Sequence, residues 1–419
     1  MIEIIRGINL ELNEINLIKT NSQEISEGDI FVAINSGNKF VEQALKSGAK
    51  YAICERTDIK DEKVISVKNS LDIFTKIAKA YRDIINPKVI GITGSNGKTS
   101  VKDILAHCLC TKFKVHKTYG NHNNHIGVPI TLCSMPQDTE VLITEIGMSD
   151  FGEIDHLAKI LRPDIGIITN IGESHLEMLK TKENVLKAKA EIIPYSKKMM
   201  INLDDEYLST LKGEFEYFSI KSISNFMAKD IKKANGDTFF DIDTTHVVTN
   251  LMGIHNVYNI LAALRVCKEL NVMDLELIEC LKNIEISKMR MEKIAFHSAL
   301  VINDAYNASP KSTLAAIETV CEYYPDHEKI VVIGDMLELG EDEPCYHRLI
   351  IEYTLTKSIE RIYFYGERYY QFASEFENEK TIFTLDKKFI AKDILLRCKE
   401  NVVIMLKASR GMKLEEIIK

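Results

Sequence analysis

The stretch "VIGITGSNGKTS", residues 89–100, constrains the fold of this chain more than any other. Its apolar beginning, 89–92, is typical of a buried strand; two glycines then break the run, and Lys98 opens a helix-like segment. A strand, a glycine turn and a helix start place backbone N–H groups and the positive end of the helix dipole together, where they attract an anion. The sequence therefore predicts a phosphate-binding loop at the edge of a sheet.

This loop is shorter than the usual G-x-x-x-x-G-K-[ST] spacing, which would need a glycine where the chain has Ile92. A plain turn between a strand and a helix is the alternative interpretation. If the loop binds a nucleotide, Lys98 supplies a positive charge to the β- and γ-phosphates and Thr99 offers a hydroxyl to Mg²⁺. The predicted ATP-binding residues of this loop are Thr93, Gly94, Ser95, Asn96, Gly97, Lys98, Thr99 and Ser100.

Composition indicates a soluble globular protein of the cytoplasm. Hydrophobic residues make up 45% and charged residues 27% of the 419 residues, and the net charge of −8 argues against a nucleic-acid partner. Nine cysteines are scattered without zinc-finger or redox spacing, as in a reducing compartment. We expect no membrane insertion, because no run of 18 apolar residues occurs and the N-terminal 15 residues lack a signal-peptide core.

The length suggests about three domains, and the order of strand-like and helix-like segments predicts an α/β fold. We expect a small α/β N-terminal domain at 1–86, a central P-loop ATPase domain with a parallel sheet at 87–288, and a C-terminal Rossmann-like α/β domain at 289–419. Predicted strands are 29–34, 51–55, 88–93, 140–146, 164–169, 299–304, 329–334, 361–366 and 401–406, and predicted helices are 40–48, 71–84, 255–270 and 274–284. Residues 215–252 are polar and β-rich, which predicts a hairpin or a short antiparallel appendage.

Seven further motifs follow the loop in a fixed order. They are "GNHNNHIGVP" (120–129), "TEIGMSDFGEI" (144–154), "TNIGESHLE" (169–177), "KAKAEI" (187–192), "MGIHNVYNILAA" (252–263), "NDAYNASP" (303–310) and "GDMLELGE" (334–341). In this order and spacing they resemble the Mur ligase family, whose own nucleotide loop, T-G-x-x-G-K-[ST], is short and matches Thr93–Thr99. The resemblance extends from about residue 88 to the C-terminus.

Two of these motifs, "YNASP" and "GDMLELGE", are similar to the branch of the family that joins D-alanyl-D-alanine to a UDP-N-acetylmuramoyl tripeptide. The D-N-P-R-like motif of the branch that adds the third amino acid is missing. The resemblance implies a monomeric, ATP-dependent ligase of peptidoglycan precursor synthesis. ATP would activate the substrate carboxylate as an acyl phosphate, which the amine then attacks.

The resemblance also implies a magnesium site, with two ions, held by Thr99, Glu145 and His175. Judged by position alone, a glutamate at a strand end, such as Glu145, is more often a solvated cap or a salt-bridge partner than a metal ligand, and histidine is an unusual ligand for Mg²⁺. The implied catalytic residues are Lys98, Glu145, His175 and Lys189.

Lys189 lies in a helical segment that also carries Lys182 and Lys187, and all three lysines could face solvent. In the family, the lysine of this motif is carbamylated and supports magnesium as a long carboxylate. Aligning "AKAEI" with the family's A-K-G-E-I selects Lys189, with Ala190 in place of the glycine.

Further contacts to the substrates are implied by the other motifs. The helical face carrying His255, Asn256 and Asn259 suits adenine, and Arg290, Asp304, Tyr306 and Asn307 would close over the ribose and phosphates from the last domain. Asn121, Asn123 and Asn124 would contact the sugar diphosphate of the UDP-muramoyl substrate. Hinges are expected near Pro87 and near 287–290.

The N-terminal domain departs from the family pattern. The frame around Gly28-Asp29 and Gly48-Ala49 is present, but the D-S-R-like and D-G-H-like motifs that accompany uridine binding are not. Two other functions therefore stay open: a Mur-type ligase of a different carboxylate and amine, or a non-catalytic ATP-binding partner subunit. The second would predict losses at Lys98, Glu145 or His175, and all three residues are present.

Overall fold

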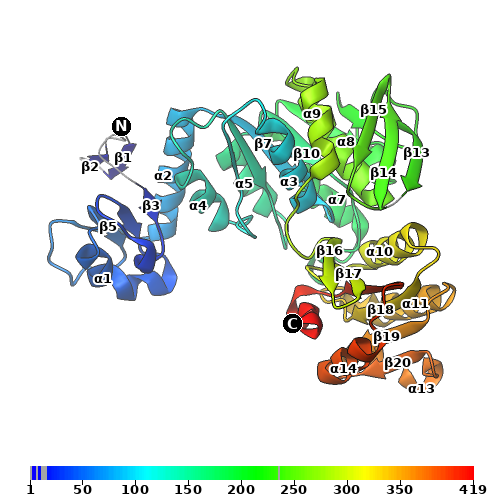
Figure 1. Cartoon of the computed structure of the whole chain (residues 1–419). Helices are drawn as coiled ribbons and strands as arrows, with labels where there is room; N and C mark the ends of the chain where they lie inside the picture. Colours follow the sequence, from blue (N-terminus) through cyan, green and yellow to red (C-terminus); the bar gives the residue numbers. More distant parts are fainter. Residues whose placement is uncertain (1, 6–7, 11–16, 235) are drawn as a thin grey trace. The chain divides into compact units, whose positions relative to one another are not determined.

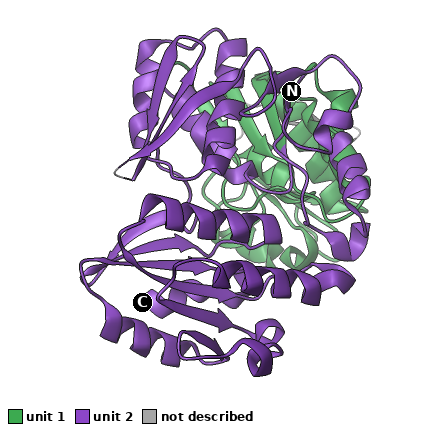
Figure 2. Ribbon diagram, turned by 90° about the vertical axis from the view of Figure 1, so that its right-hand side faces the viewer, with its two compact units in different colours: residues 1–92, 112–166, 191–198 green, residues 93–111, 167–190, 199–419 purple. Residues whose placement is uncertain are grey.

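The computed structural model describes residues 2–5, 8–10, 17–234 and 236–419. Most of the N-terminal stretch in which we find no signal-peptide core therefore lies outside the described residues. The chain divides into two compact units, drawn in green and purple in Figure 2. Unit 1 contains residues 1–92, 112–166 and 191–198, and unit 2 contains residues 93–111, 167–190 and 199–419.

The N-terminal part of unit 1 is built on a small parallel sheet (Figure 1). Its strands, in spatial order, are β3 (Ile18–Lys19), β4 (Ile30–Val32), β5 (Tyr51–Cys54) and β6 (Val64–Ser66), and α1 (Val41–Lys46) lies between β4 and β5 along the chain. A separate antiparallel pair is formed by β1 (Ile2–Ile5) and β2 (Ile8–Leu10). The short apolar runs are buried against one another, as the sequence predicts for this segment.

Helix α2 (Ser70–Ile85) connects this part to the next sheet and confirms the helix predicted at 71–84. The side chain of Asn69 caps its start by accepting the backbone N–H of Asp72 at 3.0 Å. Asn86 ends it with φ 52, directly before Pro87, which cannot continue a helix.

The central sheet has six strands in the order β12-β11-β10-β7-β9-β8. They are β7 (Lys88–Thr93), β8 (Val115–Lys117), β9 (Val141–Glu145), β10 (Ile165–Ile168), β11 (Lys198–Asn202) and β12 (Glu216–Phe218). The helices between them are α3 (Lys98–Leu109), α4 (Gly127–Cys133), α5 (Glu153–Leu161), α6 (Leu176–Leu179) and α7 (Lys182–Ala190). The pairing of β7 with β9 and of β9 with β8 is parallel, as predicted from the apolar strands.

An antiparallel meander follows in unit 2, formed by β13 (Ala228–Ala234), β14 (Asp237–Ile242) and β15 (Thr245–Thr249). It confirms the appendage expected at 215–252 with one correction. The first strand of that range, β12, pairs in parallel with β11 and so belongs to the central sheet. Helices α8 (Ile254–Glu269) and α9 (Leu275–Cys280) come next, and α8 packs against α3.

The C-terminal sheet has the order β16-β17-β21-β18-β19-β20. Its strands are β16 (Glu292–Phe296), β17 (Ala299–Asp304), β18 (Glu328–Gly334), β19 (Arg361–Tyr365), β20 (Thr381–Thr384) and β21 (Val402–Lys407); its helices are α10 (Pro310–Tyr323), α11 (Glu343–Leu355), α12 (Glu367–Tyr370), α13 (Ala373–Phe376) and α14 (Lys387–Arg397). Only β16 runs antiparallel to its neighbour within this sheet.

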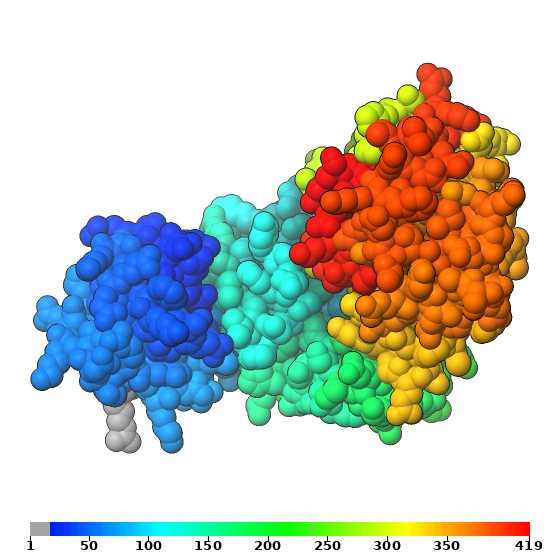
Figure 3. All heavy atoms as spheres, turned by 90° about the horizontal axis from the view of Figure 1, so that it is seen from below, coloured from blue at the N-terminus to red at the C-terminus, as the bar shows by residue number. Residues whose placement is uncertain are grey.

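Both faces of this sheet are buried. Along β18, Val331 and Ile333 pack into one apolar cluster, whereas Ile330 and Val332 pack into another. Because successive side chains of a strand point to opposite faces, the two clusters lie on opposite faces of the sheet. In the space-filling view of Figure 3, the orange and red atoms of this segment form a closely packed body.

Among the described residues, no helix is both long enough and apolar enough to cross a membrane.

Candidate active site

The glycine loop of residues 93–97 joins β7 to α3. At positions 94 and 97 it has room for glycine only. Gly94 and Gly97 have φ values of 146° and 84°, a region that side chains other than glycine rarely adopt. A Cβ atom at Gly94 would lie 1.9 Å from Oγ1 of Thr169, and one at Gly97 would lie 2.5 Å from Oδ1 of Asn259. Both glycines of the sequence motif are therefore required by the close approach of neighbouring side chains.

Asn170, which follows β10, holds the loop in place. Its backbone carbonyl accepts the N–H of Ser95 at 2.9 Å, and its side-chain oxygen accepts the N–H of Asn96 at 3.1 Å. The hydroxyl of Ser95 in turn accepts the N–H of Gly172 at 2.9 Å. The sequence predicts no role for Asn170, although a polar residue shortly after a buried strand is a signal for a site.

Lys98 folds back over its own loop. Its Nζ donates to the carbonyl oxygens of Gly94 at 2.7 Å and Ser95 at 3.4 Å. The ammonium group therefore lies beside the loop whose N–H groups are expected to receive phosphate.

Within unit 2, residues from the C-terminal segment (289–419) contact the glycine loop and the first turn of α3. Arg290 donates from Nη2 to the hydroxyl of Thr99 at 2.9 Å, and its guanidinium group stacks 4.4 Å from the centre of the Tyr306 ring. Ser309, which caps α10, donates to Oδ1 of Asn96 at 3.2 Å. This contact gives Ser309 a role that the sequence alone did not reveal.

Four buried polar atoms in this region have no hydrogen-bond partner among the described residues. They are Thr93 Oγ1, Asn96 Nδ2, His255 Nδ1 and Arg290 Nε. A buried polar atom without a partner costs about 1–3 kcal/mol, and all four atoms belong to residues that are predicted to bind ATP. ATP, with phosphate, ribose and adenine acceptors and donors, has the chemistry to satisfy them.

The polar residues of α8 are arranged as a small network. Asn256 donates to the carbonyl of Met252 at 2.8 Å, and Asn259 donates to Oδ1 of Asn256 at 3.0 Å. The side chain of Asn259 also packs against Gly97. On the same helix, burial lowers the pKa of His255, which favours the neutral ring. A role of these three residues in binding adenine stays a prediction.

Asp304 forms a buried ion pair with Lys407, whose Nζ lies 2.6 Å from Oδ2. The same Nζ donates to the carbonyl of Asn307 at 2.7 Å. Asp304 and Asn307 thus both contact the ammonium group of Lys407, a residue that was not among the predicted site residues.

Lys189 is 1% exposed and lies on α7. Burial, and then the charge of Lys98, hold the pKa of its ammonium well below the ordinary value. No carboxylate pairs with it in the part of the chain that the structure describes, and Lys187 on the same helix is exposed. Of the lysines in this motif, the one selected by the alignment is therefore the buried one.

In unit 1, Glu145 ends β9 and is 4% exposed. Its Oε1 accepts a hydrogen bond from Nδ2 of Asn123 at 2.8 Å. The strand register pairs Glu145 with Ile92, the residue directly before Thr93 in the chain. The solvated-cap interpretation of this glutamate is therefore wrong, because its carboxylate is buried and hydrogen-bonded.

The asparagines predicted to contact the substrate occupy different positions. Asn123 holds Glu145, and Asn124 accepts the backbone N–H groups of Ile126 and Gly127 at 3.1 and 2.9 Å. Asn121 is exposed. Their contact with the sugar diphosphate stays a prediction.

The chemistry of the donors fits magnesium at two of the predicted positions. Thr99 offers a hydroxyl and Glu145 a carboxylate, and Mg²⁺ prefers oxygen ligands. Within the described ranges no group of three or more His, Cys, Asp or Glu side chains forms a ready metal site. A magnesium ion would accordingly take much of its coordination from phosphate and water, as is usual for Mg²⁺ bound with nucleotides.

His175 lies directly before α6 with φ 58, and its Nδ1 is 3.4 Å from Oε2 of Glu338 in the C-terminal segment. Glu338 belongs to the quoted motif "GDMLELGE", but the sequence analysis assigned it no contact. Nothing in the local pattern indicates a pair separated by more than 160 residues.

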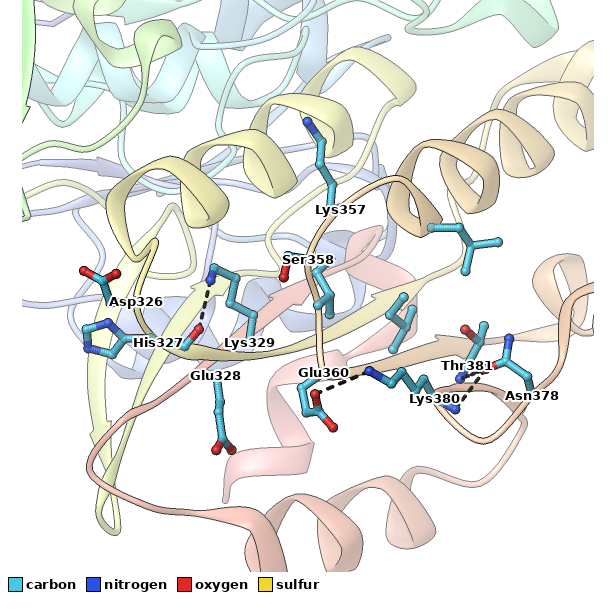
Figure 4. Close-up of a pocket in the computed structure, with 13 residues that line it drawn as sticks. Asp326, His327, Glu328, Lys329, Lys357, Ser358, Glu360, Asn378, Lys380 and Thr381 are labelled. Carbon is cyan, nitrogen blue, oxygen red and sulfur yellow. Dashed lines mark hydrogen bonds and ion pairs between the residues drawn. The ribbon is translucent and has the colours of Figure 1, made fainter.

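A hollow of about 500 Å³ lies elsewhere, at the amino ends of β18, β19 and β20 (Figure 4). Its lysines are already engaged: Lys329 donates to two backbone carbonyls, and Lys357 and Lys380 form ion pairs with Glu318 and Glu360. The loop at 334–341 follows the opposite end of β18, so this hollow is separate from the residues described above.

Fold and loop together define a P-loop nucleotide-binding protein of the α/β class. Residues 92–267 match the Mur ligase middle domain, and residues 289–410 match the domain described as Mur ligase, glutamate ligase domain. A UDP-N-acetylmuramoyl-tripeptide–D-alanyl-D-alanine ligase of Bacillus subtilis (strain 168) is 35% identical over 433 residues, which cover 98% of this chain and 93% of the relative.

Two solved structures are similar over nearly the whole chain. MurF from Acinetobacter baumannii has a TM-score of 0.87 at 26% identity and covers 96% of this chain and 92% of its own. The MurF ligase from Thermotoga maritima, determined in complex with ADP, has a TM-score of 0.86 at 29% identity and covers 97% of each chain. The chain belongs to the Mur ligase family. It has the family's three-domain fold and is an ATP-dependent, ADP-forming ligase that uses Mg²⁺.

Proposed function

We propose that this enzyme joins D-alanyl-D-alanine to a UDP-N-acetylmuramoyl tripeptide, as the final amino-acid addition to a peptidoglycan precursor. The observation that carries the proposal is the full-length similarity to relatives that bear this name, at 35% and 31% identity in Bacillus subtilis and Rickettsia prowazekii. The motifs "YNASP" and "GDMLELGE" support the same branch. The altered N-terminal motifs do not interrupt this similarity, which covers 98% and 100% of the chain.

The reaction proceeds in two balanced steps. A carboxylate oxygen of the tripeptide attacks the γ-phosphorus of ATP, and ADP leaves. The neutral amine of the dipeptide then attacks the acyl phosphate carbon, phosphate leaves with the bonding electrons, and the new amide nitrogen releases a proton. Such phosphoryl transfer depends on positioning and on stabilising negative charge.

The chain's own residues meet these needs. The loop N–H groups and Lys98 receive the phosphates, and Arg290 adds a second cation next to Thr99. Magnesium, when bound, neutralises charge on the phosphate oxygens. Glu145, Thr99 and His175 are the residues that we propose to hold it, with two ions in the complete complex.

Lys189 is proposed to react with carbon dioxide. A neutral amine adds to CO₂, forms an N–C bond and releases one proton, which leaves a carbamate anion. The lowered pKa of the buried Lys189 favours the neutral amine that this step requires, and the carbamate would lie near the positive charge of Lys98. This supports the family's carbamylated lysine at this position.

We further propose that the enzyme acts in the cytoplasm as a monomer. All nine cysteines are free thiols, which fits a reducing compartment. The domain boundaries near residues 86 and 288 remain part of this proposal.

The test is phosphate release by the purified protein with ATP, Mg²⁺, the UDP-tripeptide and D-alanyl-D-alanine. We expect release that requires both substrates and yields the pentapeptide by mass spectrometry. Release with an unrelated carboxylate and amine, but not with this pair, would assign a different Mur-type reaction. ATP binding without release from any pair would favour the non-catalytic partner subunit.

A further inference from the structure

The loop after β18, residues 334–341, is fixed at its second residue, Asp335, by the start of a helix. The carboxylate of Asp335 accepts the backbone N–H groups of Arg368 and Tyr369, both at 3.2 Å. Asp335 is 2% exposed, so these bonds are shielded from water. The loop therefore begins from a rigid point at the amino end of α12.

The next two residues are fixed by side chains from two other elements. Met336 donates its N–H to Nε2 of His347 at 3.1 Å, and Leu337 donates its N–H to Oγ of Ser409 at 3.0 Å. His347 is fully buried on α11, and its Nδ1 lies 2.8 Å from the carbonyl of Glu343. Three consecutive residues of the loop are thus held by three separate elements.

Glu338 follows with φ 66, a left-handed conformation that costs a non-glycine residue conformational energy. Two residues later, Gly340 packs closely on α6: a Cβ atom there would lie 3.4 Å from the backbone of Leu176 and Glu177. A strained residue persists only where its surroundings fix it, and such residues concentrate at functional sites. Anchors on both sides provide that fixation here.

The side chain of Glu338 reaches His175. Its Oε2 lies 3.4 Å from Nδ1 of the imidazole, and His175 itself has φ 58. Two left-handed non-glycine residues, one on each side of this contact, are therefore held facing each other. Both side chains keep some exposure, 28% for His175 and 66% for Glu338, so the contact leaves room for a ligand beside it.

We propose that Glu338 is a positioning residue for His175. Its carboxylate accepts the Nδ1–H of the imidazole and so selects the tautomer whose Nε2 presents a lone pair. Histidines that bind metal ions generally donate their other N–H to a carboxylate or carbonyl, which fixes the ring. The catalytic consequence rests on the role proposed for His175; the tautomer does not.

The tautomer is tested directly by ¹⁵N NMR of the full chain labelled at histidine, without nucleotide, at pH 8. His175→Gln identifies the signals of His175. In the wild type we expect a protonated Nδ1, and in Glu338→Ala a shift toward the mixture of tautomers found in free histidine. Unchanged His175 signals in Glu338→Ala would overturn the proposal, whatever reaction the enzyme proves to catalyse.

Kinetic measurements can distinguish the positioning of His175 by Glu338 from a general effect of negative charge in the loop. We expect Glu338→Ala to lower kcat or raise the apparent KM for Mg²⁺ at least tenfold, in the range of roughly 10–100-fold known for such supporting carboxylates. Glu338→Gln keeps an oxygen acceptor and should retain most activity. Glu341→Gln, an exposed residue of the same loop, removes the same charge and should behave as wild type. Equal activity in Glu338→Ala and Glu341→Gln would refute the role.

The melting temperature, measured together with activity, distinguishes a positioning role of Glu338 from a merely structural one. Glu338→Gly removes the carboxylate and also relieves the left-handed strain, so its melting temperature should equal or exceed that of the wild type while its activity falls as in Glu338→Ala. Loss of stability together with activity would show that Glu338 only supports the fold, and the proposal would fail.

Discussion

Lys98 shows how one residue adapts to its loop before phosphate arrives. Its ammonium group rests on two backbone carbonyls of the loop, at 2.7 and 3.4 Å. Exchanging these neutral acceptors for anionic phosphate oxygens would add the attraction between opposite charges. In the role proposed for it, Lys98 would therefore receive phosphate with little rearrangement.

Replacing Lys98 with alanine should lower the ligase rate at least about a hundredfold, because an aimed positive charge is lost. Phosphate release at saturating ATP measures the effect, and circular dichroism checks that the variant is folded. A rate close to the wild type would mean that the glycine turn has only a structural role.

Lys189→Ala should be nearly inactive and should regain some activity with formate or acetate, which can take the place of the carbamate. The matched control is Lys187→Ala, which removes an exposed lysine two residues away on α7 and should retain full activity. Steady-state rates with and without added carboxylate give the comparison. Equal rates in the two variants would contradict the carbamate.

Single residues were predictable from sequence where a local pattern defines them. The loop, Lys98 and the buried Lys189 lie within motifs of a few residues. Contacts such as that between Glu338 and His175 depend on the packing of segments far apart in the chain, and no local pattern contains them. Pairing of Asp304 with Lys407 belongs to the same class, since the register of β17 and β21 creates it.

At the scale of elements, α3 and its glycine loop both pack against α8. Gly97 ends the loop and begins the helix, and Asn259 on α8 fills the space where a side chain of residue 97 would go. Long apolar strands such as β7, β9 and β18 were predicted because a strand buried on both faces is continuously apolar. Strands β8, β16 and β20 were missed because they are short or polar edge strands, and β12, also an edge strand, was assigned to the appendage instead of the central sheet.

Gly97→Ala should weaken binding of a non-hydrolysable ATP analogue at least tenfold, because the new methyl group displaces Asn259 and the left-handed backbone is strained. Gly152→Ala is the matched control: its φ is 79, but nothing lies within 4 Å of the new Cβ. Both variants carry the backbone cost of about 1–2 kcal/mol, so only Gly97→Ala should lose affinity in titration calorimetry. Equal affinities would show that Asn259 yields without consequence.

At the scale of the whole molecule, buried neutral histidines link stability to pH. Burial lowers the pKa of His116 and His347 below the usual value near 6.5. The unfolded chain therefore binds protons at pH values where the folded protein does not. Their contribution to the free energy of unfolding is complete above about pH 6.5 and is lost as the pH falls through the folded pKa.

The free energy of unfolding should consequently decrease between pH 7 and pH 5, and the decrease should be smaller in His347→Gln. Urea titrations at several pH values measure both slopes. The slope is the informative quantity, because His347→Gln also disturbs the hydrogen bond to Met336 in the 334–341 loop and lowers stability at every pH. Identical slopes in the two proteins would refute the assignment to His347.

The last consequence concerns the linker into the C-terminal segment. Asp103, on α3, accepts hydrogen bonds from both the N–H and the hydroxyl of Ser287, at 3.0 and 2.5 Å. Beyond that anchor, Met289 and Met291 have φ values of 60° and 52°, so the linker turns sharply on either side of Arg290. The helix that follows the predicted phosphate-binding loop thus also holds the linker. By thermodynamic reciprocity, any effect of a bound nucleotide on the position of this linker must be matched by an equal effect of the linker on the affinity for nucleotide.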